Sequence, residues 1–391
     1  MTTVLISGAG IAGPSLAFWL SRYGYDVTVV EQARGLRASG AAVDFRGDQM
    51  ALLERMGILA EMRSYDTAMG DQLIVDAAGR QVSRLPSVIF SGELEIERGD
   101  LSGVLYRHTK DGVDYVFGDR ITALDEQADS VYVTFEHRRA RRFDLVVGAD
   151  GQHSGVRRLA FGDGFQVDLG YYTAGFSMPN VLGLDHSARI YNEPGRYVNV
   201  SSARNPRRAA VSLVFASPEL AYDRRDLAEQ KRIIAEHYGA TGWVVPQLLR
   251  ELEKADDLYF ASLSQIQMPR WSTGRIALLG DAAWCGGPGA SGTGYAMLGA
   301  YTLAGELVST GDHAVAFARY EEAMRPATTK SAKFATGAGK FLAPATEAKI
   351  RRRNRTYRFL SSRPMTGLIN KLAKGHANTG DLADYQPLTT V

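Results

Sequence analysis

Short apolar runs and segments of helical spacing alternate along the first 31 residues. Residues 4–7 form an apolar run, and the glycine-rich residues 8–13 follow it directly. Residues 14–20 then repeat apolar side chains at helical spacing, and a second apolar run, 27–30, ends on Glu31. This order of strand, glycine turn, helix, strand and acid predicts a nucleotide-binding βαβ unit, around which the rest of the chain is organised.

The residue types in this unit suit a dinucleotide. Gly8 permits the tight turn, Gly10 lets a pyrophosphate approach the backbone, and Gly13 lets the helix pack on the strand; Ala12 belongs to the same turn. A pyrophosphate would lie at the helix N-terminus, where free N–H groups and the helix dipole favour negative charge. Glu31 can accept hydrogen bonds from both ribose hydroxyls and disfavours a 2′-phosphate, so we expect FAD or NAD rather than NADP.

The pattern then changes along the chain. A helix is expected over 50–62 and a hairpin over 72–85, whereas the weakly periodic stretch 32–47 is expected to be a loop. Between residues 165 and 270 the pattern predicts an antiparallel sheet, interrupted by one helical insertion over about 224–254. Its expected strands are 171–178, 188–191, 197–201, 209–215 and 259–267. A buried strand at 276–279 and a long helix at about 293–310 follow.

We therefore expect an α/β protein. Its Rossmann-type nucleotide-binding domain is discontinuous, formed by residues 1–164 and 271–325. A mostly antiparallel sheet domain, residues 165–270, is inserted into it, and a C-terminal helical tail occupies residues 326–391.

Composition narrows the function classes. Of 391 residues, 45% are apolar and 23% charged, which is ordinary for a globular protein, and the net charge of +2 gives no sign of a nucleic-acid partner. The one cysteine, Cys285, cannot form an internal disulfide, and the pattern shows neither a leader nor a membrane span. We expect a cytoplasmic protein without integral membrane contact. The histidines lack ligand spacing, so no metal centre is expected, and the basic run 351–355 is interpreted as a solvated helix face.

Two further motifs place carboxylates after apolar strands. Residues 144–157 run from an apolar strand into Gly148, Ala149 and Asp150, and residues 275–283 run from another into Gly280 and Asp281. The C-terminal edge of such strands is where α/β proteins bind ligands, and a carboxylate there can accept from a ribityl hydroxyl. Asp also caps turns, so each motif alone leaves binding and turn capping open.

Together and in this order, the three motifs resemble the class A flavoprotein monooxygenases of the para-hydroxybenzoate hydroxylase fold. The resemblance extends from the glycine turn to about residue 325, and it implies a glutathione-reductase-like FAD-binding domain. Within this superfamily the chain is similar to the tetracycline-inactivating monooxygenases, which share the pattern around Arg37, Asp44 and Arg46 and the helix start at Arg98.

The resemblance implies roles for residues on the adenosine side of FAD. Glu31 would hold the adenosine ribose, and Arg37 would lie near the pyrophosphate. Asp150 would lie beside the pyrophosphate and the route of the nicotinamide donor.

On the flavin side, Asp44 would lie near the ring, Arg98 would contact the ribityl or phosphate region, and Asp281 would hydrogen-bond the ribityl chain. The segment after Asp281 departs from the family pattern, because residues 284–294 contain one proline and no glutamine between the glycines. Its final residues can still present backbone N–H groups to the flavin at a helix start. These residues are Gly292, Thr293 and Gly294.

The same resemblance implies an activity. NAD(P)H would reduce the flavin, O2 would form a C4a-hydroperoxide, and one oxygen would pass to an electron-rich carbon of an aromatic or polyketide-like small molecule. Two alternatives stay open: a flavin-dependent dehydrogenase or reductase, which the altered 284–294 segment suggests, and a protein that sequesters a small molecule without turnover. A monomer and a homodimer are equally compatible with the sequence.

Candidate residues for substrate and catalysis are fewer. Arg46 follows Asp44 by two positions and is a candidate catalytic residue near the flavin edge, with a salt bridge in the loop as the alternative. Apolar side chains of the sheet domain and of the altered segment are candidates for a substrate pocket, although strand alternation predicts that half of those in the sheet only fill the core. They are Phe176, Met178, Phe215, Trp284 and Pro288.

Overall fold

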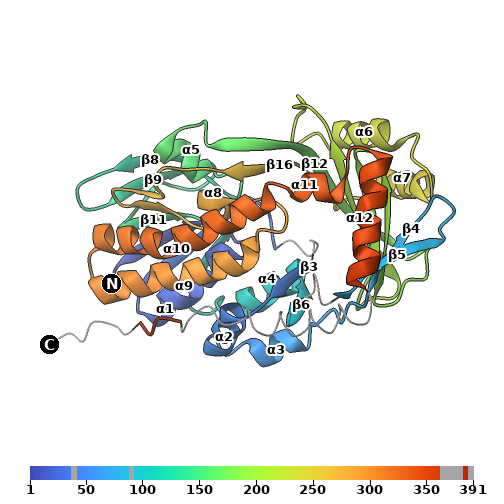
Figure 1. Cartoon of the computed structure of the whole chain (residues 1–391). Helices are drawn as coiled ribbons and strands as arrows, with labels where there is room; N and C mark the ends of the chain where they lie inside the picture. The colour runs from blue at the N-terminus through green and yellow to red at the C-terminus, as the bar shows by residue number, and fades with distance from the viewer. Residues whose placement is uncertain (37–41, 88–91, 362–381, 386–391) are drawn as a thin grey trace.

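The computed structural model describes residues 1–36, 42–87, 92–361 and 382–385 (Figure 1). A six-stranded sheet forms one half of the molecule, in the order β17-β18-β11-β1-β2-β7. All neighbours are parallel except the short edge pair β17 and β18. Its strands are β1 (Thr3–Ser7), β2 (Asp26–Glu31), β7 (Asp114–Phe117), β11 (Leu145–Gly148), β17 (Ser272–Thr273) and β18 (Ile276–Leu278).

Helices and a small sheet surround the parallel sheet. The helix α1 (Ala12–Arg22) packs against α9 (Gly292–Thr310), and α10 (His313–Ala335) lies along α9. Nine consecutive residues of α1 are buried, because its apolar side chains point both to the sheet and to α9. The other elements of this half are α4 (Arg98–Arg107), α5 (Gly155–Phe161), α8 (Asp281–Trp284), β8 (Ile121–Glu126), β9 (Val131–Phe135) and β10 (Arg141–Phe143).

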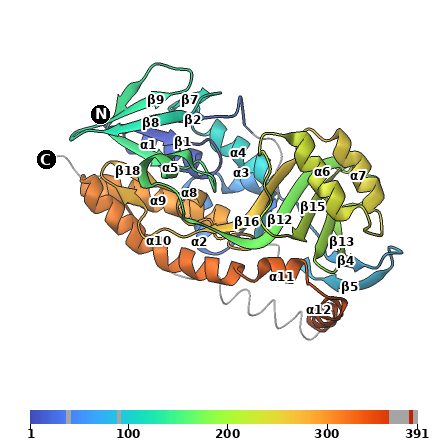
Figure 2. The same cartoon turned by 90° about the horizontal axis from the view of Figure 1, so that it is seen from above.

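A seven-stranded sheet forms the other half, in the order β16-β12-β15-β14-β13-β4-β5. Figure 2 shows α6 and α7 on one side of it and α11 and α12 on the other. The strands are β4 (Gln72–Val75), β5 (Gln81–Leu85), β12 (Gln166–Pro179), β13 (Ser187–Glu193), β14 (Arg196–Ser202), β15 (Arg208–Ala216) and β16 (Tyr259–Ile266). The helices are α6 (Leu227–Tyr238), α7 (Val245–Lys254), α11 (Ala338–Leu342) and α12 (Glu347–Leu360).

The α/β fold class is confirmed, and the strands expected between 171 and 267 are present. Three details differ from the sequence-based expectation. The hairpin β4–β5 joins the seven-stranded sheet through parallel pairing of β4 with β13. Within the stretch interpreted as a loop, β3 (Ala42–Phe45) pairs with β6 (Leu94–Glu97). The helix expected over 50–62 is divided into α2 (Asp48–Arg55) and α3 (Leu59–Arg63), because Gly57 adopts a positive φ of 73° between them.

The structure bears on membrane spans and on metal sites only for the residues that it describes. Across these residues, no helix combines the length and the apolar character that crossing a membrane requires. Within the same residues, no cluster of three or more His, Cys, Asp or Glu side chains is arranged to hold a metal ion.

Candidate functional site

The glycine turn after β1 divides into packing positions and one open position. A β-carbon on Gly8, whose φ is +108°, would lie 2.5 Å from the carbonyl oxygen of Ala149, and one on Gly13 would overlap the carbonyl oxygen of Gly8. Among the residues that the structure describes, a β-carbon on Gly10 would meet only Nη2 of Arg98, at 3.9 Å. Gly8 and Gly13 therefore allow backbone segments to touch, whereas Gly10 leaves space in front of the N-terminus of α1, which no side chain caps.

Glu31 connects the end of β2 to this turn. Its Oε2 accepts a hydrogen bond from the Ala9 backbone N–H at 2.8 Å, and its Oε1 accepts one from the Ala33 N–H at the same distance. Each carboxylate oxygen retains a free lone pair, so the side chain can still accept from ribose hydroxyls. The structure thus places Glu31 beside the glycine turn, as its expected role requires.

Asp150 follows β11 and lies next to the same turn. Its Oδ2 accepts from the backbone N–H groups of Gly155, at 2.8 Å, and Val156, at 3.1 Å. Its Oδ1 is buried and has no hydrogen-bond partner among the described residues. Burial raises the pKa of this carboxyl, and the hydrogen bonds to Oδ2 offset part of the effect. Turn capping accounts for Oδ2, while Oδ1 is left for a donor from outside the protein.

Asp281 begins α8, directly after β18. A β-carbon on Gly292, the first residue of α9, would lie 3.4 Å from its Oδ1, so Asp281 faces the start of that helix. Burial raises the pKa of Asp281, and the positive charge of Arg98 partly counteracts this. A β-carbon on Gly280 would lie 3.1 Å from Cβ of Ala12, which brings this motif against the glycine turn.

A buried arginine joins the two Asp motifs, and the sequence analysis assigned it no role. Arg157 is 8% exposed and donates from Nη1 to the Ala282 carbonyl at 2.8 Å and from Nη2 to the Gln152 carbonyl at 2.6 Å. Desolvation lowers its pKa. It therefore fixes the turn after Asp150 to the helix that begins at Asp281. Its place at the end of motif 144–157 was the available signal.

These residues fit FAD. An open Gly10 and the N-terminus of α1 suit a pyrophosphate, the free lone pairs of the Glu31 carboxylate suit the hydroxyls of a ribose, and the Asp281 carboxyl suits those of a ribityl chain. Asp150 is the strongest sign that a ligand belongs here, because its buried Oδ1 is a hydrogen-bond acceptor that the described residues leave without a donor.

The comparisons with known proteins agree. The sequence matches the family described as the FAD binding domain over residues 1–335. A flavin-dependent monooxygenase of Legionella longbeachae is 35% identical over 339 residues, which cover 85% of this chain and 87% of the relative. The chain belongs to the FAD-dependent monooxygenases. The Mycobacterium tuberculosis protein Rv1260, named as uncharacterised, is 44% identical over 330 residues, covering 82% of this chain and 89% of that one. The crystal structure of tetracycline destructase Tet(51) aligns with a TM-score of 0.85 and 31% identity over 99% of both chains.

The monooxygenase's loop near β3 contains a salt bridge. Nε of Arg46 donates to Oδ2 of Asp44 at 2.9 Å, with the two side chains 43% and 33% exposed. The alternative of a loop ion pair is therefore what the structure contains, and the catalytic role of Arg46 stays a prediction. Arg37, expected near the pyrophosphate, lies outside the described residues.

The altered segment 284–294 has an inner and an outer part. Trp284 is buried in the core, with its ring centroid 4.5 Å from that of Trp271, so it does not face an open pocket. Pro288 is half-buried in the loop that follows. Thr293 and Gly294 lie in the first turn of α9, where Gly294 is closely covered by the side chain of Gln49.

The sheet residues expected in a substrate pocket face the opposite direction. Phe176, Met178 and Phe215 are buried in a core formed between the seven-stranded sheet and α6 and α7. Because side chains alternate along a strand, their neighbours in sequence project from the other face. The structure does not bring these three side chains together with the residues that fit FAD.

That other face carries an apolar cluster, which includes Ile190 and Tyr197, and beside it a polar patch of side chains that the sequence analysis did not select. We call this patch the polar face. Gly175, Ser212 and Asn199 are paired across β12, β15 and β14 and share this face. Oδ1 of Asn199 is buried and lacks a hydrogen-bond partner among the described residues. An unsatisfied amide oxygen on a sheet face makes Asn199 a candidate for a ligand-facing position, and only knowledge of the strand pairing reveals it.

Two contacts place this face on the side of the altered segment. The hydroxyl of Ser331, near the end of α10, donates to the Ala290 carbonyl at 2.6 Å. The chain continues into α11, where Gly339 packs on the ring of Tyr171. Tyr171 lies on the same face of β12 as Gly175. The loop after Asp281 and the polar face therefore belong to one side of the sheet.

Proposed function

We propose that this protein is an NAD(P)H-using monooxygenase that hydroxylates an aromatic or polyketide-like small molecule with O2. The observation that carries the proposal is the pair of carboxyls, Asp150 with its buried and unpartnered Oδ1 and Asp281, held against an open glycine turn by Arg157. When bound, FAD supplies the redox chemistry, taking a hydride equivalent from the donor and activating O2.

The chain's own residues bind and orient. Glu31 accepts hydrogen bonds from the hydroxyls of the adenosine ribose. Asp150 lies beside the pyrophosphate, and its free Oδ1 accepts a hydrogen bond from a donor group of the cofactor. Asp281 accepts from the ribityl chain, and Arg98 balances negative charge between it and the phosphates. The N-terminus of α9, at Gly292 and Thr293, stabilises negative charge on the reduced ring.

The seven-stranded sheet supplies the candidate substrate-binding surface. The polar face that contains Gly175, Ser212 and Asn199 offers hydrogen-bonding groups beside apolar side chains such as Ile190, which suits an aromatic molecule rich in oxygen atoms. The likeness to a tetracycline destructase over 99% of both chains supports a polycyclic substrate. Arg46 would stand at the flavin edge of this space once its pairing with Asp44 is released.

The decisive experiment measures whether an oxygen atom of O2 enters the product. The purified protein is expected to be yellow and to oxidise NADPH or NADH faster when a substrate from a panel of phenols, quinolones, tetracyclines and rifamycins is added. Label from 18O2 should enter the product. Oxidised product without label would instead establish a flavin-dependent dehydrogenase, and tight binding without NAD(P)H consumption would establish a sequestering protein.

Two further points belong to this proposal. A cytoplasmic location is supported by the single cysteine, Cys285, which is buried and whose pKa is raised by burial, so that it is an unreactive thiol. Fractionation of expressing cells tests the location. Light scattering decides between a monomer and a homodimer.

A further inference from the structure

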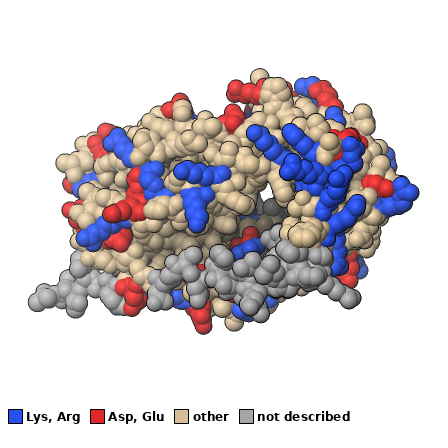
Figure 3. All heavy atoms as spheres, viewed as in Figure 1, with Lys and Arg blue, Asp and Glu red and all other residues tan. Residues whose placement is uncertain are grey.

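Positive charge is concentrated in one segment of the chain. Residues 323–360, from the second half of α10 to the end of α12, contain ten Lys and Arg and a single acid, Glu347. The whole chain has a net charge of only +2, so the remainder is net negative. Figure 3 shows Lys and Arg side chains gathered on this side of the molecule over α10 and α12.

Three of these cations are engaged by the protein. Arg325 donates to the Met268 carbonyl at 3.0 Å and pairs with Glu321. Arg353 is buried and donates to the carbonyls of Phe341 and Leu342. Arg358 donates to the Val82 carbonyl at 2.9 Å.

Most of the others are exposed and unpaired. Arg351 lies 3.7 Å from Glu347, while six cations form no ion pair within the residues that the structure describes. These six are Lys330, Lys333, Lys340, Lys349, Arg352 and Arg355. Together with the two phenylalanines described next, they define what we call the basic face.

Phe334 and Phe341 are two of the three exposed phenylalanines of this segment, the third being Phe359 in α12. Phe334 is 80% exposed and Phe341 is 51% exposed, and each directly follows a lysine, Lys333 and Lys340. An isolated apolar side chain on a surface needs no explanation, but an aromatic ring beside a lysine, repeated at the end of α10 and in α11, matches a boundary between water and an apolar phase.

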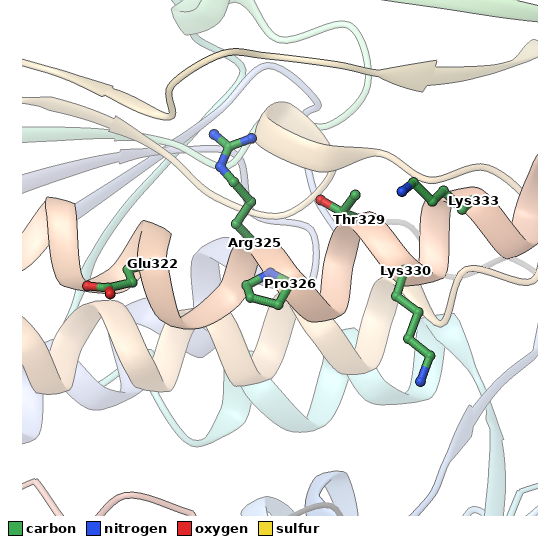
Figure 4. Close-up of a pocket in the computed structure, with 6 residues that line it drawn as sticks. All are labelled: Glu322, Arg325, Pro326, Thr329, Lys330 and Lys333. Atoms are coloured by element: carbon green, nitrogen blue, oxygen red, sulfur yellow. The ribbon is translucent and has the colours of Figure 1, made fainter.

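A groove in α10 adds a concave element. It has a volume of about 540 Å3 and is lined by residues of this helix alone, namely one acid, Glu322, three cations, Arg325, Lys330 and Lys333, and Pro326 and Thr329 (Figure 4). Lys330 points to one side of the helix and Lys333 to the other, so the cations flank the hollow. None of the residues assigned to FAD lines this groove.

We propose that the basic face binds the surface of membranes rich in anionic phospholipid. The unpaired cations contact headgroup phosphates, and Phe334 and Phe341 insert between headgroups. Charge complementarity selects an anionic surface, and the exposed rings select a lipid surface, because the phosphate backbone of a nucleic acid offers no apolar phase. The contact is peripheral and does not require a membrane-spanning helix.

Vesicle flotation of the FAD-loaded protein tests this surface. Binding to vesicles of equimolar phosphatidylcholine and phosphatidylglycerol is expected, with at least tenfold weaker binding to phosphatidylcholine alone and a steep loss on adding salt. The double variant Arg352→Glu, Arg355→Glu should weaken binding to anionic vesicles at least tenfold. Phe334→Ser, which changes no charge, should weaken it several-fold.

The matched control changes two exposed arginines in the other half of the molecule, Arg138→Glu and Arg139→Glu, by the same charge. This variant should bind nearly as the unmodified protein does, and flavin content verifies the fold of every variant. Equal loss of binding in the control, no binding of the unmodified protein to anionic vesicles, or binding to duplex DNA in place of vesicles would each overturn the proposal.

Discussion

The two sheets of this monooxygenase present their candidate functional residues in different ways. In the parallel sheet, Asp150 and Asp281 each come within three residues of the end of a strand, β11 and β18, so each is marked by its own local motif, and both lie at one edge of the sheet. In the seven-stranded sheet, Asn199 and Ser212 lie on a face, one position away from large apolar side chains. An edge site is marked by a local motif, whereas a face site depends on which set of alternate residues points to the ligand.

The largest effect is expected at the edge site. Gly13→Val forces a side chain into the carbonyl of Gly8, so we expect loss of folding or a fall in the free energy of unfolding of about 5 kcal/mol, with a colourless product. Flavin absorbance and thermal unfolding measure both effects.

Gly10→Val is the matched control for that prediction. Its β-carbon would meet no atom of the described residues closer than Arg98 Nη2, so the FAD-free protein should keep its stability while FAD binding is lost. Wild-type flavin content in both variants would contradict the division between packing and ligand-facing glycines.

The second prediction concerns the apolar face of the seven-stranded sheet. Phe215 is 1% exposed and packs between the sheet and α6. Phe215→Ala should therefore lower the free energy of unfolding by about 3–5 kcal/mol. At a temperature where the variant is folded, its KM for a substrate found by the NADPH-oxidation screen should not change. A large increase in KM together with unchanged stability would contradict this prediction and would support Phe215 as a residue of the substrate pocket.

The positions of the edge residues could be predicted from the sequence because their signals are local, while their roles toward FAD stay predictions. Gly8, Glu31 and Asp281 are all found where the strand–turn patterns place them. The partner of β4 was not predictable, because its parallel pairing with β13 joins segments more than 100 residues apart. β3 was missed since four residues of mixed polarity have no distinct period.

The candidate pocket residues of the seven-stranded sheet were harder to choose from the sequence, for a different reason. Phe176 and Gly175 are adjacent, and hydrophobicity favours the first as a pocket residue although it is the one that fills the core. Strand periodicity predicts two faces but does not say which one the helices α6 and α7 cover. Arg157 was equally hidden, because its acceptors are backbone carbonyls, which no residue type reveals.

The third prediction tests Asp281 through pH. Asp281→Asn keeps the shape but removes the charge, so FAD affinity at neutral pH should fall about 10- to 100-fold, the effect of a hydrogen bond to a charged group. Titration of the FAD-free protein with FAD measures it. An unchanged affinity would remove Asp281 from the site.

The pH dependence has a defined sign. Burial raises the pKa of Asp281 above its ordinary value of 3.8, so in the FAD-free protein the folded state retains this proton more readily than the unfolded state. This contribution to stability is present at low pH and is lost as pH rises through the raised pKa. Hydroxyl donors of FAD favour the carboxylate, so affinity should increase over the same pH window. The Asn variant should show a smaller increase, because of the two site carboxyls whose pKa burial raises, only Asp150 remains.

The smallest effect is expected on the polar face. Oδ1 of Asn199 has no partner within the described residues, so Asn199→Ala should leave the free energy of unfolding nearly unchanged or slightly raise it. If the amide hydrogen-bonds the substrate, KM should rise about 3- to 10-fold, the effect of one neutral hydrogen bond. Phe176→Leu, on the opposite face, is the control, and steady-state kinetics should show its KM unchanged. An effect on KM from Phe176 and none from Asn199 would reverse the assignment of the two faces and place the substrate beside α6 and α7.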